Sequence, residues 1–170
     1  CQVCDSKELE LVFSLGWLPN VNVMQKIGEP LQEQKIYPAE LYQCKQCSLV
    51  QLGYEVDSSE VFPIDYAYRS GSTRLLLDNF KDLAKEVLTL YPHTEEELVV
   101  DIGANDGSLL EQFKLLNYHP IGIEPTGAGI DAAKKGIMTI RRSLDSGSVM
   151  EIVGKFGRAK VVTACNVFAH

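Results

Sequence analysis

The sequence predicts an α/β fold, in which a parallel sheet carries helices on its faces and follows a small cysteine-rich domain. Two C-x-x-C pairs occupy the N-terminal third of the chain, and an apolar stripe with helical spacing follows Ser72. From Leu98 onward, short apolar runs alternate with helical patterns, which is the order that produces parallel strands joined by crossover helices. We therefore divide the chain into a small domain at 1–53, a connector at 54–72 and an α/β domain at 73–170.

The composition excludes several functional classes. The chain is 45% hydrophobic, which is ordinary for a globular protein, and its formal net charge of −7 argues against duplex nucleic-acid binding, which needs a basic face. It has no run of about 18 apolar residues and no signal-peptide pattern, so neither a membrane span nor export is predicted. Cysteines without an export signal favour a reducing, cytoplasmic location, where C-x-x-C pairs more often hold metal than form disulfides.

The N-terminal domain, 1–53, is predicted to be small and rich in loops. Its apolar pieces, such as 11–13 and 49–52, are short and predict brief strands. Gly28, Pro30 and Pro38 are expected to interrupt the chain between these strands. A region of this size buries little core, so it needs a staple to hold its fold.

Four cysteines are the predicted staple. Residues 5–43 lie between the two C-x-x-C pairs. Each pair brings two thiolates to one point, so together the pairs complete the tetrahedron that Zn²⁺ prefers. Four protein ligands leave no open coordination position, which predicts a structural rather than a catalytic zinc. The alternative is two disulfides or unrelated buried cysteines, which two pairs at matching spacing make less favoured. The predicted ligands are Cys1, Cys4, Cys44 and Cys47.

The connector and the first long helix follow. The aromatic content of 54–72 is high for a flexible linker, so we expect this segment to pack against a domain. Apolar residues between Leu75 and Leu88 recur at spacings of three and four, which predicts an amphipathic helix that Pro92 ends.

The α/β domain is predicted to alternate strands and helices. The apolar run at 98–102 ends at a glycine and is typical of a buried parallel strand. The other predicted strands are 120–124, 138–140 and 160–164, and the other predicted helices are 108–116, 128–135 and a segment within 146–153. Four strands leave an apolar edge, and the first residue is not methionine, so we expect this chain to be the front part of a longer protein.

The turn after the first parallel strand is the main candidate for a ligand site. The segment 101–107 has the spacing D-x-G-x-x-x-G, in which Gly103 permits a tight turn and Gly107 would let a ligand lie close to the backbone. A dinucleotide fold needs G-x-G-x-x-G here, so an NAD-dependent oxidoreductase is disfavoured. Asp101 and Asp106 would repel phosphate, but they suit a cationic ligand that joins an amino acid to a nucleoside, such as S-adenosylmethionine.

Glu124 ends the next predicted strand and strengthens this interpretation. In nucleoside-binding α/β folds, a carboxylate at this place accepts hydrogen bonds from both ribose hydroxyls. The alternative is a plain strand–turn–helix with a chance surface glutamate. The glycine turn and the strand-end carboxylate together favour the ligand.

The order of the motifs resembles a known family, the S-adenosylmethionine-dependent C-methyltransferases that act on nucleotide-linked deoxysugars. In that family a zinc-binding module precedes a Rossmann-like methyltransferase domain. The resemblance covers the whole chain and implies a Rossmann-like methyltransferase sheet that is incomplete here. The motifs that carry it are Cys1-x-x-Cys4, Leu15-Gly16-x-x-Pro19, Cys44-x-x-Cys47 with 48–52, 65–70, 101–110, 122–125 and 166–170.

The resemblance implies S-adenosylmethionine as cofactor and a small-molecule substrate, a nucleotide-linked 4-keto deoxysugar. A base would remove a proton from the carbon beside the ketone, and the resulting enolate would attack the sulfonium methyl. By the same resemblance, His170 and one tyrosine of the Tyr66 and Tyr68 pair would face the sugar, with Tyr68 favoured. The implied cofactor-binding residues are Asp101, Gly103, Asn105, Asp106, Gly107, Glu124, Pro125 and Asn166.

Two other functions stay open at this point. One is a zinc ribbon that recruits protein or RNA, followed by a non-catalytic nucleotide fold; low basicity argues against RNA, and the intact glycine turn argues against degeneracy. The other is a methyltransferase of the same build that acts on another substrate. The sequence predicts neither the sugar, nor the methylated carbon, nor the oligomeric state.

Overall fold

The computed structural model describes residues 1–93 and 95–168, and the chain forms two compact units, Cys1–Pro63 and Ile64–His170. The expected connector, 54–72, is therefore shared between the two units. Within the described residues, no helix has both the length and the apolar character needed to cross a membrane.

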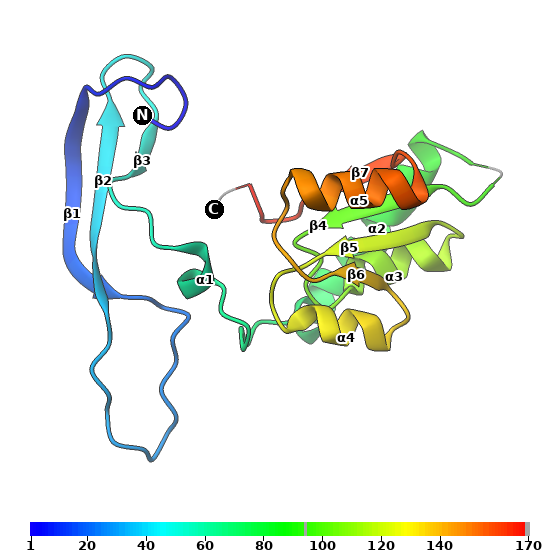
Figure 1. Ribbon diagram of the computed structural model, residues 1–170, viewed down its shortest axis with the longest axis horizontal. Coiled ribbons are helices and arrows are strands. Elements are labelled where there is room, and N and C mark those ends of the chain that lie inside the picture. The colour runs from blue at the N-terminus through cyan, green and yellow to red at the C-terminus, as the bar shows by residue number, and fades with distance from the viewer. Residues whose placement is uncertain (94, 169–170) are drawn as a thin grey trace. The chain divides into compact units, whose positions relative to one another are not determined.

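The first unit contains a three-stranded antiparallel sheet of order β1-β2-β3 (Figure 1). Strands β1 (Leu9–Pro19) and β2 (Ile36–Cys44) form a hairpin, and β3 (Val50–Leu52) pairs with the end of β2. The hairpin strands are longer than the brief strands expected, because their pairing continues across two register shifts. Pro38 does not interrupt the chain but lies inside β2 opposite Trp17, beside the second shift, where a sheet tolerates proline.

A short helix, α1 (Ser58–Val61), completes this unit. The Tyr37 hydroxyl donates a hydrogen bond to the Glu60 carboxylate, and the Asn20 side chain donates to the Glu60 carbonyl. These contacts join α1 to the hairpin, so the first half of the expected connector is part of the first unit.

The second unit confirms the predicted α/β fold. Its four-stranded sheet has the order β6-β5-β4-β7, and every neighbouring pair of strands is parallel. Two strands match their predicted bounds, and each of the other two differs from its predicted bounds by one residue at both ends. The strands are β4 (Leu98–Ile102), β5 (His119–Ile123), β6 (Met138–Ile140) and β7 (Val161–Thr163).

Helices cover both faces of this sheet. Buried side chains of α2, α3 and α4 form one apolar cluster with Val99 of β4, whereas Leu98 and Val100 share the other cluster with Ile152 of α5. Successive strand residues point to opposite faces, so β4 contributes to both clusters. The helices are α2 (Arg74–Leu90), α3 (Ser108–Leu115), α4 (Ala128–Lys134) and α5 (Ser146–Phe156), and a single 3₁₀ turn, η1 (Ser70–Ser72), precedes α2.

The parallel register decides which residues meet at the carboxyl edge of the sheet. Asp101 pairs with Gly122 of β5 on one side and with Thr163 of β7 on the other. The turns that follow β4, β5 and β7 therefore lie at one edge, which is where open α/β sheets bind their ligands.

Candidate functional site

Four thiols come together in the first unit, as the sequence predicts. The sulfur atoms of the two C-x-x-C pairs all lie within 4.8 Å of one another. The Sγ atoms of Cys1 and Cys47 are 3.6 Å apart, as are those of Cys4 and Cys44. Zn–S bonds of about 2.3 Å in a tetrahedron separate the sulfurs by about 3.8 Å, so these thiols fit zinc. All the cysteines are free, which opposes the disulfide alternative.

The two C-x-x-C pairs form matching turns. The Cys1 carbonyl accepts a hydrogen bond from the Asp5 amide (3.1 Å), and the Cys44 carbonyl accepts one from the Ser48 amide (2.9 Å). Asp5 and Ser48, each directly after the second cysteine of its pair, have φ of 57° and 62°. Each turn therefore curls tightly enough to direct both of its thiols to one point.

Cys44 is the buried member of the cluster. Hydrogen bonding from the Cys47 amide, and then from the Gln46 amide, lowers the pKa of the Cys44 thiol to about 7. A lowered pKa favours the thiolate, which is the form that binds zinc. Four thiolates leave no open coordination position, so the cluster fits a structural metal.

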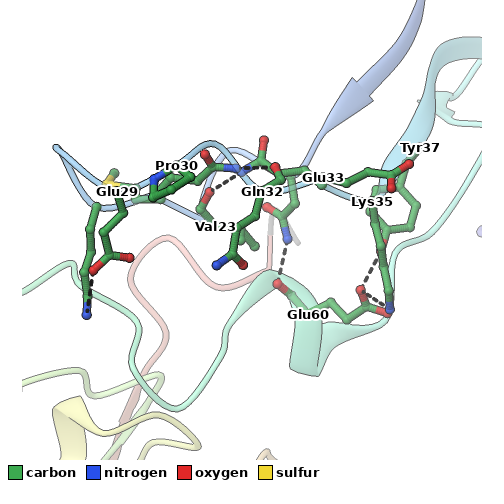
Figure 2. A pocket seen from close by; sticks show the side chains of 13 residues that line it. Val23, Glu29, Pro30, Gln32, Glu33, Lys35, Tyr37 and Glu60 are labelled. Carbon is green, nitrogen blue, oxygen red and sulfur yellow. Dashed lines mark hydrogen bonds and ion pairs between the residues drawn. The ribbon is translucent and has the colours of Figure 1, made fainter.

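The first unit also has a polar hollow of about 420 Å³ between the β1–β2 loop and α1 (Figure 2). At one end, Tyr37 and Lys35 both contact the Glu60 carboxylate, so the charges there compensate each other. The hydrogen bond to Glu60 raises the pKa of Tyr37 to about 12. None of the residues predicted to bind metal, cofactor or substrate lines this hollow.

In the second unit, the predicted glycine turn follows β4 at the carboxyl edge of the sheet. Gly103, Asn105 and Gly107 have φ of 69°, 50° and 73°, so the turn reverses direction over very few residues. The amides of Gly103 and Ala104 both donate to the Ile123 carbonyl at the end of β5, at 2.8 and 3.1 Å. The turn is thereby attached to the neighbouring strand.

Both glycines face other parts of the protein. A Cβ on Gly107 would lie 2.9 Å from the Cβ of Ala132 in α4, and a Cβ on Gly103 would lie 2.6 Å from Cγ2 of Val167. We expected Gly107 to keep space for a ligand, but α4 occupies that side. A role of either glycine in cofactor binding stays a prediction.

Glu124 lies at the end of β5, where it was predicted, and only 5% of the residue is exposed. Its Oε2 accepts from the Asn105 amide (2.9 Å), and its Oε1 accepts from both the amide (2.9 Å) and the hydroxyl (2.6 Å) of Thr126. A carboxylate has about four acceptor positions, so most of them are used within the protein and one remains for a ligand hydroxyl. Sequence reasoning missed Thr126, although a threonine two residues after a strand-end carboxylate is a signal of such a contact.

Asp101 is buried at the end of β4. Its Oδ1 accepts a hydrogen bond from the Thr163 hydroxyl in β7 (2.7 Å). Burial raises the pKa of Asp101 to about 7; the Thr163 hydrogen bond opposes this shift and the nearby Glu124 charge adds to it. Thr163 was also missed, because only the strand register places it opposite Asp101.

Asp101→Asn is expected to flatten the dependence of stability on pH. The folded-state pKa of about 7 exceeds the ordinary value of about 3.9, so unfolding releases a proton between these values. The free energy of unfolding then falls as pH rises through that window, by at most about 1.4 kcal/mol per pH unit. Urea denaturation at about pH 5 and about pH 7.5 measures the free energy of unfolding of both proteins. Relative to the wild type, Asp101→Asn should be more stable at the higher pH than at the lower pH. Parallel pH profiles would contradict the shift.

The charge of Asp106 is partly compensated by a nearby lysine. Its Oδ2 lies 3.8 Å from the Lys135 ammonium, which also donates to the Ser108 hydroxyl at 2.8 Å. Together with the raised pKa of Asp101, this pair makes the edge less negative than the sequence predicts. Lys135 carries no sequence signal for this role, because α4 brings it there.

The segment 64–71, which we call the tyrosine strap, lies against the glycine turn. The Ser70 amide donates to Oδ1 of Asn105, and the Gly71 amide donates to Oδ2 of Asp106, both at 2.9 Å. Asn105 and Asp106 are buried, and both they and the strap lie within the second unit, so these are internal contacts of that unit. The second half of the expected connector is thus part of this unit.

Both predicted tyrosines belong to the strap. The ring centroids of Tyr66 and Tyr68 are 6.3 Å apart, and the Tyr68 carbonyl accepts a hydrogen bond from Nδ2 of Asn105 (3.2 Å). The Tyr68 residue is 48% exposed, so its side chain is accessible to a substrate. The structure thus brings the predicted substrate-facing pair next to the predicted cofactor turn.

The other predicted residues are Pro125, Asn166 and His170. Pro125 follows Glu124 and is exposed, and Asn166 is exposed in the turn after β7 with φ of 55°. His170, the predicted catalytic histidine, lies outside the described residues.

Two comparisons with known proteins bear on the N-terminal domain and on the chain as a whole. Residues 1–62 match a family described as "Putative zinc binding domain". The chain is also 24% identical, over 172 aligned positions, to the C-methyltransferase NovU of Streptomyces niveus. That alignment covers 100% of this chain and 40% of NovU, so the chain spans less than half of the length of this relative. The chain is thus similar, throughout its length, to part of a C-methyltransferase, and its own residues 1–62 match a zinc-binding domain.

Proposed function

We propose that this chain forms the zinc module and a cofactor half-site of an S-adenosylmethionine-dependent methyltransferase. The observation that carries the proposal is the carboxyl edge of the parallel sheet, where buried Glu124 holds the Asn105 amide of the glycine turn. Similarity to a C-methyltransferase over the whole chain supports it. The four-cysteine cluster would supply a structural element, because four thiolates would complete the coordination of a zinc ion.

In this proposal, the carboxyl edge binds and orients the cofactor, which supplies an electrophilic methyl group when bound. Glu124 would accept a hydrogen bond from a ribose hydroxyl at its remaining acceptor position. Other atoms of the three turns would complete the contacts. The proposed set is Asp101, Gly103, Asn105, Asp106, Gly107, Pro125 and Asn166.

We further propose that the acceptor is a carbon of a nucleotide-linked 4-keto deoxysugar, methylated through an enolate in the cytoplasm. The similarity to a protein named as a C-methyltransferase supports carbon as the acceptor atom. His170 would take the proton from the carbon beside the ketone, and Tyr68 or Tyr66 would contact the sugar. The protein would lower the barrier by positioning that carbon and by stabilising the enolate charge.

Ligand-induced stabilisation tests the cofactor proposal. S-adenosylhomocysteine at about 100 times its Kd should raise the free energy of unfolding of the full-length, zinc-loaded protein by about 2.7 kcal/mol. Differential scanning fluorimetry measures this as a rise in Tm, and NAD at the same concentration should produce no rise. Absence of a rise with both S-adenosylmethionine and S-adenosylhomocysteine would overturn the proposal, and a rise with NAD would favour an oxidoreductase.

A pair of matched variants links this binding to the carboxyl edge. Glu124→Gln should weaken S-adenosylhomocysteine binding about tenfold or more in calorimetry, because an amide presents fewer acceptor positions than a carboxylate. Glu151→Gln removes an equivalent charge from α5, where the glutamate pairs with Lys155 instead, and should leave the affinity unchanged. A panel of nucleotide-linked 4-keto sugars, with radiolabelled methyl transfer as the readout, then tests the acceptor separately.

A further inference from the structure

Arg69 is the side chain that fastens the middle of the tyrosine strap. Its Nε donates to Oδ2 of Asp131 in α4 at 2.8 Å. Its Nη1 donates to the carbonyl of Tyr68 at 2.9 Å and also to the carbonyl of Tyr66. The guanidinium is planar and its donors have fixed directions, so these bonds together hold the backbone on both sides of Ala67 in one conformation.

Other bonds fasten the two ends of the strap. At the start, the Ile64 carbonyl accepts a hydrogen bond of 2.7 Å from the Gly127 amide, just before α4. At the end, the amides of Ser70 and Gly71 donate to side chains of the glycine turn. Tyr66 and Tyr68 stand between these two anchors in the chain, in the part of the strap that Arg69 holds.

The ion pair between Arg69 and Asp131 is partly shielded from water. The two side chains are 31% and 34% exposed, so water screens them only in part. Lys134 approaches the other oxygen of Asp131 at 2.7 Å, and Lys134 first and Arg69 second lower the pKa of Asp131 to about 2. The carboxylate is therefore charged at every pH at which the protein would work.

We propose that Arg69 is a positioning residue for methyl transfer. It holds the Tyr66–Tyr68 backbone in a fixed position relative to the glycine turn at 101–107. It would act through the tyrosines and not touch cofactor or acceptor. This inference rests on the proposed function. Since a displacement of about 1 Å at reacting groups costs about 100-fold in rate, loosening the strap should slow catalysis and leave cofactor binding nearly intact.

Arg69→Met and Lys134→Met test the proposal as a matched pair. Each removes one cation from Asp131, but only Arg69 also contacts the strap. In the full-length, zinc-loaded protein, Arg69→Met should lower kcat for methyl transfer to a 4-keto nucleotide sugar by about 10- to 100-fold. Its Kd for S-adenosylhomocysteine should change by less than about threefold, and Lys134→Met should stay within about twofold of wild type in both quantities.

Arg69→Lys separates charge from geometry. Lysine keeps the charge beside Asp131, but its single nitrogen cannot reproduce the separate positions of Nε at Asp131 and Nη1 at the two carbonyls, so kcat should recover only in part. Hydrogen exchange of peptides spanning 64–71, with S-adenosylhomocysteine bound, gives a readout that needs no acceptor. Exchange there should be faster in Arg69→Met and unchanged in Lys134→Met.

The outcomes distinguish this inference from the proposed function. If the wild type binds no S-adenosylhomocysteine, the proposed function is wrong. If the wild type binds it but Arg69→Met keeps wild-type kcat or wild-type exchange across the strap, the positioning role is wrong. Equal losses in kcat and in S-adenosylhomocysteine affinity would show that Arg69 supports the whole unit, which also overturns the inference.

Discussion

Cys44→Ser is expected to abolish zinc binding and to unfold the first unit. All of residues 1–63 are described, and Cys44 alone among them is buried, whereas every residue of β1 after Leu9 is exposed. A unit without an apolar core depends on its metal, and binding to such sites contributes on the order of 10 kcal/mol to folding. Serine is a poor zinc ligand, so the substitution removes most of that free energy.

Zinc content by atomic absorption and limited proteolysis of the full-length protein measure the effect of Cys44→Ser. Cys165→Ser is the matched control, because this cysteine lies in the second unit outside the cluster and should keep both zinc and protease resistance. Retained zinc in the Cys44 variant would refute the ligand assignment.

Gly107→Val is expected to destabilise the second unit by roughly 3 kcal/mol or more, a large share of the stability of a small domain. Two effects add. Gly107 has φ of 73°, which a β-branched residue adopts only with strain. Its Cβ would also lie 2.9 Å from the Cβ and 3.1 Å from the Cα of Ala132, so α4 would have to move as a whole.

Gly154→Ala provides the control for Gly107→Val. Gly154 lies inside α5, and a Cβ there meets nothing within 4 Å. Alanine should therefore stabilise the helix by up to about 1 kcal/mol. Urea denaturation followed by circular dichroism compares the two variants. A Gly107→Val protein as stable as the wild type would mean that α4 does not pack against this turn.

Local sequence patterns were sufficient for much of the fold. The strands 98–102 and 138–140 and the helices of the second unit follow from hydrophobic periodicity, because burial of one face imposes a repeat that neighbouring residues display. The zinc cluster was equally accessible, since two C-x-x-C pairs carry their ligand geometry in their spacing. The lengths of β1 and β2 could not be predicted from local patterns, because strand pairing joins residues far apart in the sequence.

The tyrosine strap shows the same limit within the candidate site. The sequence motif marked Tyr66 and Tyr68, but nothing local assigned 64–71 to the second unit or paired Arg69 with Asp131. That pairing depends on where α4 lies, 62 positions further along the chain. Contacts of this kind arise from packing and leave no periodic trace in the sequence.

The composition and motifs by themselves determined which residue types stand at the carboxyl edge and in the zinc cluster. Only the tertiary structure decided the state of these groups. Burial raises the pKa of Asp101, Lys135 pairs with Asp106, and Thr126 uses acceptor positions of Glu124. The physical reason is that the charge and the free hydrogen-bonding capacity of a carboxylate depend on its solvation and its partners in space. The four cysteines differ from these carboxylates, because the spacing of the two C-x-x-C pairs already indicates that the four thiols bind one metal together.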